Sequence, residues 1–157
     1  MRYVSVFLIA LVMALPAQAA EDFAKSVAAQ SRYYGVGWQN DGQHWTIDLA
    51  LGESDGTVAY PTVDCSGTWT LIKKNLARLE FIERITDGLD NCIPLGTVTL
   101  EPLPDGELLY TFWEHADRVD ARGVLVPMGP SRLPYMTLLK KTLNTVSLDY
   151  MLPEFSE

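Results

Sequence analysis

Two cysteines in the middle of the chain constrain its fold more than any other feature. Cys65 and Cys92 are the only cysteines among the 157 residues. Between them lie two runs, Gly67–Lys73 and Arg78–Ile85, rich in the aromatic and β-branched residues that favour strands. In an exported chain, two cysteines most simply form one bridge. The sequence therefore predicts a β domain closed by a Cys65–Cys92 disulfide.

Cysteine chemistry is a weaker reading of the same two residues. A cysteine nucleophile needs a nearby histidine, and the chain offers only His44 and His115. Structural zinc sites use closely spaced C-x-x-C pairs, whereas these cysteines are 27 positions apart. We therefore expect no metal, no cofactor and no catalytic cysteine.

The first 19 residues have the pattern of a secretory signal peptide. A basic start at Arg2 precedes an apolar run from Val4 to Leu15, and Ala17-Gln18-Ala19 is an A-x-A cleavage site. The apolar run is too short to cross a hydrocarbon core of ~30 Å. We expect an exported protein, periplasmic or secreted, with no membrane insertion after leader cleavage. An uncleaved anchor is the alternative.

The charge balance narrows the range of partners. The chain has 12 Lys and Arg against 20 Asp and Glu, and the leader contains only one of the basic residues, Arg2. An acidic surface repels phosphate backbones and anionic lipid headgroups. Nucleic acid is therefore not an expected partner, whereas a basic protein or a cationic small ligand fits the charge.

Hydrophobic periodicity predicts the fold class. Trp45, Ile47 and Leu49 alternate with polar residues, as in a half-buried strand, and turn signals such as Asp41-Gly42 separate the runs. Helical crossovers between the runs are lacking. We expect an all-β fold, an antiparallel barrel or sandwich of about eight short strands with short terminal helical segments. The expected strands are Tyr34–Gln39, His44–Leu49, Thr57–Tyr60, Gly67–Lys73, Arg78–Ile85, Thr97–Leu100, Leu108–Trp113 and Asp120–Val126.

The chain divides into four expected segments. These are the signal peptide 1–19, an N-terminal helical segment 20–33, the β domain 34–126 and a C-terminal extension 127–157. Helical spacing runs from Glu21 to Arg32, and a second short helix is expected over Tyr135–Leu143. The end of the extension is too apolar for a solvated tail, so we expect it to pack on the domain; binding of another chain is the alternative. Its apolar residues are Leu148, Tyr150, Met151, Leu152 and Phe155.

A series of short motifs between Tyr34 and Leu125 resembles the sequence pattern of a known family of β domains. They are Tyr60-Pro61, Cys65-Ser66-Gly67-Thr68-Trp69, Phe81-Ile82-Glu83-Arg84-Ile85, Cys92 and Gly96-Thr97-Val98-Thr99-Leu100. In this order the chain resembles the small extracytoplasmic β domain attached to some bacterial membrane Ser/Thr kinases, which also occurs as a stand-alone exported protein. The resemblance implies a disulfide pair and no enzymatic activity. The chain departs from it in its Gly35-Val36-Gly37-Trp38 start and in its apolar tail.

Glu83 is the position where pattern and chemistry disagree. Period two places Glu83 on the same face of its strand as Phe81 and Ile85. Burying a carboxylate without a partner is costly. Three outcomes stay open: an ion pair with an inward arginine such as Arg122, a position at the wet rim, or a polar anchor for a ligand inside a cavity.

Aromatic residues supply the other candidates for ligand binding. Together with Glu83, these are Trp38, Trp69, Trp113 and Tyr110, although tryptophans more often fill cores and interfaces. We expect Trp69 and Phe81 to belong to the central core. The sequence shows no nucleophile–base arrangement, so we assign no catalytic residue.

These features favour an exported, non-catalytic binding module. The first hypothesis is protein interaction, as an inhibitor-like or envelope accessory protein that presents an acidic rim to a basic partner. The alternative is a small-ligand carrier with a barrel cavity lined by Glu83 and aromatic residues. A filled interior favours the first hypothesis, and a roomy interior favours the second.

Overall fold

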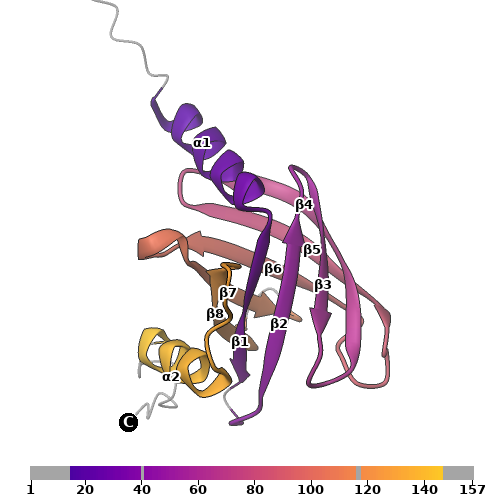
Figure 1. The fold of residues 1–157 in the computed structure, drawn as a ribbon. Coiled ribbons are helices and arrows are strands. Elements are labelled where there is room, and N and C mark those ends of the chain that lie inside the picture. Colours follow the sequence, from indigo (N-terminus) through magenta and orange to yellow (C-terminus); the bar gives the residue numbers. More distant parts are fainter. Residues whose placement is uncertain (1–14, 40, 116–117, 147–157) are drawn as a thin grey trace, which may run out of the picture.

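The computed structural model describes residues 15–39, 41–115 and 118–146, which form an antiparallel β-barrel (Figure 1). Each strand pairs with the next along the chain, and the last pairs with the first, so the barrel is closed. The all-β expectation is confirmed, as a barrel. The strands are β1 Arg32–Gln39, β2 His44–Leu51, β3 Asp55–Tyr60, β4 Cys65–Asn75, β5 Arg78–Asp87, β6 Leu95–Pro102, β7 Leu108–Trp113 and β8 Ala121–Pro127.

The interior of the barrel is largely filled by alternate residues of the strands. Trp69 is fully buried and Phe81 is 3% exposed, which confirms that both belong to the core. The ring of Trp69 lies 5.5 Å from that of Phe81 and 6.1 Å from that of Tyr110, measured between centroids. Such aromatic contacts add about 0.5–1.5 kcal/mol each beyond the burial of the rings.

Helix α1, Leu15–Gln30, covers one end of the barrel (Figure 1). Val27 is buried in the barrel core, with Phe23 packed beside it. The helix ends at Gln30 because Ser31 adopts a left-handed conformation with φ of 57°. Arg32, expected at the end of the helix, is instead the first residue of β1. Within the described residues, no helix combines the length and the apolar character needed to span a membrane.

Helix α2, Tyr135–Thr145, packs on the outside of β1 and β8 (Figure 1). Its buried Leu138 and Leu139 contact an apolar strip made of Tyr34, Val36, Trp38, Val124 and Val126. Thr142, fully buried, donates its hydroxyl to the Val36 carbonyl at 3.0 Å and accepts the Val124 N–H at 3.2 Å. The apolar residues expected to pack at the end of the extension lie outside the described residues. A 3-10 turn, Pro104–Gly106, connects β6 to β7.

Candidate functional site

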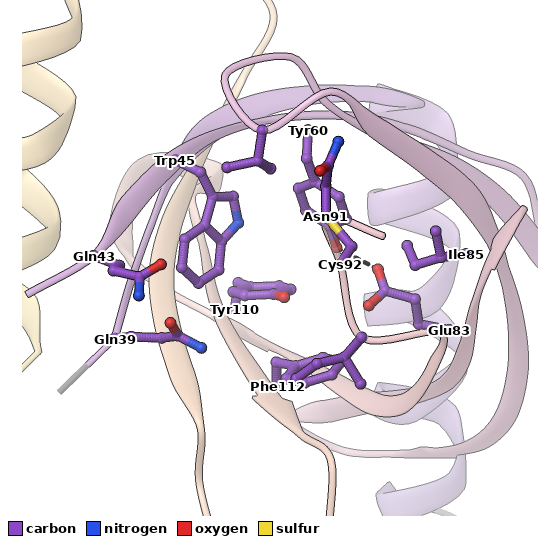
Figure 2. A pocket seen from close by; sticks show the side chains of 12 residues that line it. Gln39, Gln43, Trp45, Tyr60, Glu83, Ile85, Asn91, Cys92, Tyr110 and Phe112 are labelled. Carbon is purple, nitrogen blue, oxygen red and sulfur yellow. Dashed lines mark hydrogen bonds between the residues drawn. The ribbon is translucent and has the colours of Figure 1, made fainter. Parts of the chain in front are cut away.

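The end of the barrel opposite α1 contains a pocket of about 120 Å³. Connections of an up-and-down barrel alternate between its two ends, so the β1–β2, β3–β4, β5–β6 and β7–β8 connections surround this end. We call it the mouth. Aromatic side chains, one carboxylate and several amides line the pocket (Figure 2). They are Trp45, Tyr60, Tyr110, Phe112, Glu83, Gln39, Gln43 and Asn91, together with Val63, Ile85, Cys92 and Ile93.

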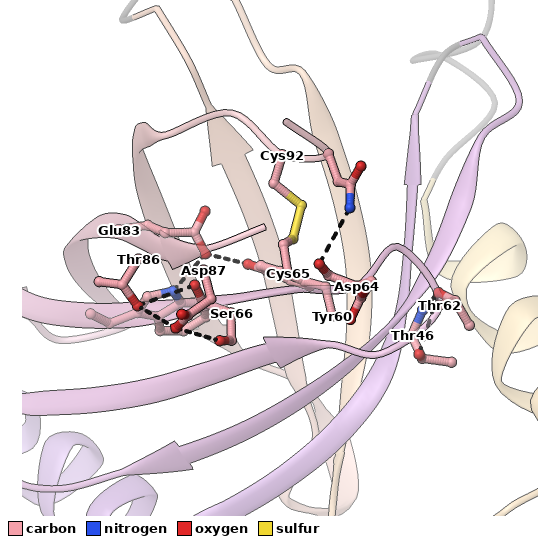
Figure 3. Close-up of a disulfide and its surroundings, with 12 residues drawn as sticks. Thr46, Tyr60, Thr62, Asp64, Cys65, Ser66, Glu83, Thr86, Asp87 and Cys92 are labelled. Atoms are coloured by element: carbon pink, nitrogen blue, oxygen red, sulfur yellow. Dashed lines mark hydrogen bonds between the residues drawn. A yellow bond between two sulfur atoms is a disulfide. The ribbon is translucent and has the colours of Figure 1, made fainter. Parts of the chain in front are cut away.

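The disulfide holds one side of the mouth in place. Cys65 is the first residue of β4, and Cys92 lies in the β5–β6 connection. The two are bonded, with their Cα atoms 6.4 Å apart, as predicted (Figure 3). Cys92 and its neighbours Asn91 and Ile93 line the pocket, so the bridge fixes a loop that borders it. A disulfide also indicates a non-reducing, extracytoplasmic environment.

Glu83 is buried in the barrel wall, and its carboxylate points into the interior (Figure 2). Its side chain is held by two donors, one from the adjacent strand β4 and one from β3 beyond it. The indole N–H of Trp69, the residue directly opposite on β4, donates to Oε1 at 2.8 Å. The hydroxyl of Tyr60 on β3 donates to the same oxygen. Among the described residues, no side chain forms a hydrogen bond with Oε2. This oxygen can therefore accept a hydrogen bond from a ligand in the pocket.

Burial dominates the electrostatics of this carboxyl group. It raises the pKa of Glu83, and the hydrogen bonds from Tyr60 and Trp69 lower it by less. Burial also raises the pKa of Tyr60 and of Tyr110 well above 10, so both remain neutral hydroxyls. No ion pair within the described part of the chain includes Glu83. The carboxyl group therefore faces the pocket without a counter-charge.

Arg122 is not the partner of Glu83, and the expectation of an inward arginine was wrong. On β8, Ala121 and Leu125 belong to the barrel core, whereas Val124 and Val126 pack under α2 on the outside. Arg122 shares the outer face with these two valines because side chains alternate along a strand. The wall of the barrel therefore separates Arg122 from Glu83.

Two glycines leave space for aromatic rings at the mouth of the barrel. Gly37 on β1 is directly opposite Trp45 on β2, and a Cβ at Gly37 would lie 2.8 Å from the indole ring. A Cβ at Gly96 on β6 would lie only 2.3 Å from the ring of Phe112. Both distances are closer than real Cβ contacts allow, so each aromatic ring occupies space that a side chain would otherwise fill.

The structure brings together three of the five candidate ligand-binding residues. Glu83 and Tyr110 line the pocket. Trp69 does not line it but donates a hydrogen bond to the carboxyl group of Glu83. Trp38 instead packs on the outer face of β1 against α2. Trp113 lies on the outer face of β7, where the guanidinium of Arg78 sits 5.9 Å from its ring centroid.

Sequence reasoning missed Trp45, Tyr60 and Phe112 as pocket residues. Alternation does place Trp45 on the inner face of its strand. The glycine opposite it, Gly37, leaves space for the indole ring and could have indicated a pocket residue. Tyr60 on β3 contacts Glu83 on β5 across the intervening strand β4, and nothing in the local sequence indicates that contact.

Acidic residues predominate on the connections around the mouth. Arg118 is paired with Asp120 at 2.7 Å, so it does not offset the other carboxylates. Within residues 15–39, 41–115 and 118–146, no three His, Cys, Asp or Glu side chains converge as metal ligands would. The acidic residues of the rim, apart from the Asp120 that pairs with Arg118, are Asp41, Asp64, Asp90 and Glu114 on the connections and Asp87 at the end of β5.

Comparison with protein-family models, curated proteins and solved structures finds no match to this chain. The arrangement in the mouth is therefore the main guide to function. It combines a carboxyl group, four aromatic side chains and an acidic rim at a place that solvent reaches. These groups are suited to holding a ligand, and the described residues that line the pocket include no nucleophile paired with a base.

Proposed function

We propose that this protein is an exported, non-catalytic binding module that holds a small ligand in the mouth of its barrel. The observation that carries the proposal is Glu83: a buried carboxyl group, fixed by Tyr60 and Trp69, that faces a pocket and has no ion-pair partner in the described part of the chain. Burial of a carboxyl group without a counter-charge costs folding free energy, even when hydrogen bonds hold the group in place. Groups that are costly to folding mark functional sites.

The size of the pocket limits what it can hold. Sites for drug-sized ligands measure about 300–1,000 Å³, whereas a cavity of about 150 Å³ accommodates benzene. The mouth, at about 120 Å³, accepts a compact ligand or one compact group of a larger molecule. A small-ligand site therefore fits the geometry better than carriage of a large hydrophobic cargo.

Protein interaction is the second candidate, and both the largely filled interior of the barrel and the surroundings of the mouth favour it. Leu89, in the β5–β6 connection, and Leu95, the first residue of β6, are 55% and 48% exposed next to the acidic rim. A basic partner protein that docks here would cover both leucines. This role is compatible with the resemblance to an extracytoplasmic kinase-associated domain, which we retain as a proposal.

The test is a screen of compact fragments of all charge types, with the indole N–H signals of the four tryptophans observed by NMR. Ligand binding in the mouth shifts Trp45 and Trp69 and leaves the outer Trp38 and Trp113 unchanged. Ile93→Phe narrows the pocket and should abolish the shifts. Ile82→Phe, at a half-buried isoleucine of the outer wall, is the matched control. Fragments that bind equally well to Ile93→Phe, or a complete lack of binding, would contradict the proposal.

A further inference from the structure

The chemistry of the mouth selects one class of ligand, and this inference rests on the ligand-binding function proposed above. We propose that the pocket binds an alkylammonium group, with the cationic nitrogen against Glu83 and the carbon atoms against the rings of Trp45, Tyr110 and Phe112. The occupant would supply the counter-charge that Glu83 lacks within the described part of the barrel.

Hydrogen bonding within the site directs one carboxylate oxygen toward the ligand. Trp69 and Tyr60 both donate to Oε1, so they fix the plane of the carboxyl group. Oε2 has no donor among the described residues and is the oxygen that an ammonium group would contact. A primary ammonium group can donate to Oε2 a charge-assisted hydrogen bond, about twice as strong as a neutral one, whereas a quaternary ammonium group has no N–H and is attracted by charge alone.

The aromatic walls favour a cation over a neutral molecule of the same shape. A cation within about 6 Å of an aromatic ring is attracted to its face, and cages of aromatic rings recognise quaternary ammonium groups in this way. Trp45, Tyr110 and Phe112 line the same pocket as Glu83 (Figure 2). The acidic rim, which includes Asp41, further attracts cations to the mouth.

Binding of such a cation is coupled to loss of a proton. The empty pocket favours the protonated form of Glu83, because burial raises its pKa. A bound ammonium group favours the carboxylate. At a pH where the free carboxyl group is protonated, its proton leaves to solvent as the cation enters, so the charge inside the barrel stays balanced. Tyr60 and Tyr110 are the titratable groups that face Glu83 among the described residues, and both stay neutral.

Three probes of nearly equal shape separate charge from size. Tetramethylammonium, tert-butylammonium and tert-butanol each have about five non-hydrogen atoms, which suits a pocket below the size that holds benzene. Calorimetric titration across the pH range in which free Glu83 titrates, in two buffers of different ionisation enthalpy at each pH, gives both affinity and protons released. We expect both cations to bind at least about tenfold more tightly than tert-butanol, and to release protons.

Two variants test the role of the carboxylate. Glu83→Gln keeps the acceptor for Trp69 and Tyr60 but removes the charge, and should weaken the cations at least about tenfold while leaving tert-butanol unchanged. Glu80→Gln makes the same charge change on the outer face of β5 and should have no effect. Because the comparison of probes uses the unmodified protein, it remains valid even if Glu83→Gln is poorly folded.

The outcomes distinguish this inference from the proposed function. Equal affinity for tert-butanol and the cations, or cation binding that survives in Glu83→Gln, would overturn the alkylammonium assignment and leave a ligand site of another class. Failure of all three probes would also overturn it, and the fragment screen would then decide whether the mouth binds ligands at all. Two further probes distinguish a small amine from the lysine of a partner protein. Nα-acetyl-lysine methylamide presents the lysine ammonium group alone, and a lysine peptide presents it within a longer chain. Tighter, salt-sensitive binding of the peptide assigns the ammonium group to a partner protein.

Discussion

Trp69 and Glu83 lie directly opposite each other on β4 and β5, and the indole N–H of Trp69 donates to Glu83 Oε1 at 2.8 Å. The tryptophan is fully buried, so its N–H requires an acceptor inside the barrel. Glu83 satisfies that donor with one oxygen and turns the other toward the pocket. The pair thus connects the packing of the core to the chemistry of the mouth.

Removal of the buried charge should stabilise the protein in a pH-dependent manner. Because the pKa of Glu83 is raised above its ordinary value of 4.5, the folded state binds more protons than the unfolded state above that pH. Wild-type stability therefore falls as pH rises from 4.5 through the folded-state pKa. Glu83→Gln lacks this loss, so its thermal midpoint relative to wild type should rise over the same interval. A lower midpoint than wild type at neutral pH would mean that the carboxylate stabilises the fold.

Truncation of Phe81 should be among the most destabilising changes in the chain. Phe81 is 3% exposed and packs on Trp69, so Phe81→Ala should cost about 3–5 kcal/mol in the free energy of unfolding. Ile82→Ala, on the half-buried outer face of the same strand, should cost clearly less. Chemical denaturation measures both values. The reverse order would mean that the two faces of β5 are exchanged.

Loss of the disulfide should affect both stability and the mouth. The bridge joins residues separated by 27 positions, and the loop-closure model gives about 3–4 kcal/mol for a loop of this length. Replacing Cys65 and Cys92 together by alanine should lower stability by this amount. Since the bridge also fixes the loop that carries Asn91 and Ile93, affinity for fragments in the mouth should fall as well. Unchanged affinity in the folded double variant would show that the loop is positioned by other contacts.

The hydroxyl of Thr142 should contribute to holding α2 on the barrel. Thr142→Val has nearly the same shape but leaves the Val36 carbonyl and the Val124 N–H without their partner. The expected cost is about 1–3 kcal/mol in the free energy of unfolding. Thr145→Val, at an exposed position of the same helix, is the control. Equal effects of the two variants would show that the bridging hydroxyl contributes nothing specific.

The strands and the inward position of Glu83 could be predicted from the sequence, because alternation is clear where one face of a strand is polar. In β5, Glu80 and Arg84 face outward and mark the register unambiguously. The cysteine pair could be predicted for a different reason, since the chain contains no third cysteine.

The directions of Trp38 and Trp113 could not be predicted, because both faces of their strands carry apolar residues. In β1, glycines occupy the inner face near the mouth, and the outer face of Tyr34, Val36 and Trp38 is apolar because α2 covers it. Alternation gives no signal when a helix distant in sequence buries the second face. The direction of Arg122 was predicted wrongly for the same reason. Helix α2 covers the valines of the outer face of β8, so this face is apolar although it points away from the barrel interior.

Contacts within the site depend on register, which local sequence does not specify. Two irregularities in the pairing of β4 with β5, between Ser66 and Gly67 and between Leu71 and Lys73, shift the alignment of the two strands. Trp69 meets Glu83 only in the register that lies between them. A regular hairpin counted from the turn would have paired Glu83 with a different residue.

The central claim is that Glu83 lies in the barrel without a counter-charge and receives one from its ligand. Titration of the Glu83 carboxyl carbon by NMR tests this most directly, first in the free protein and then with saturating tetramethylammonium. We predict a midpoint above the ordinary value of 4.5 in the free protein, because burial raises the pKa, and a lower midpoint once the cation is bound. A midpoint at or below 4.5 in the free protein would contradict the account, because the hydrogen bonds to Glu83 or a neighbouring cation would then outweigh the effect of burial.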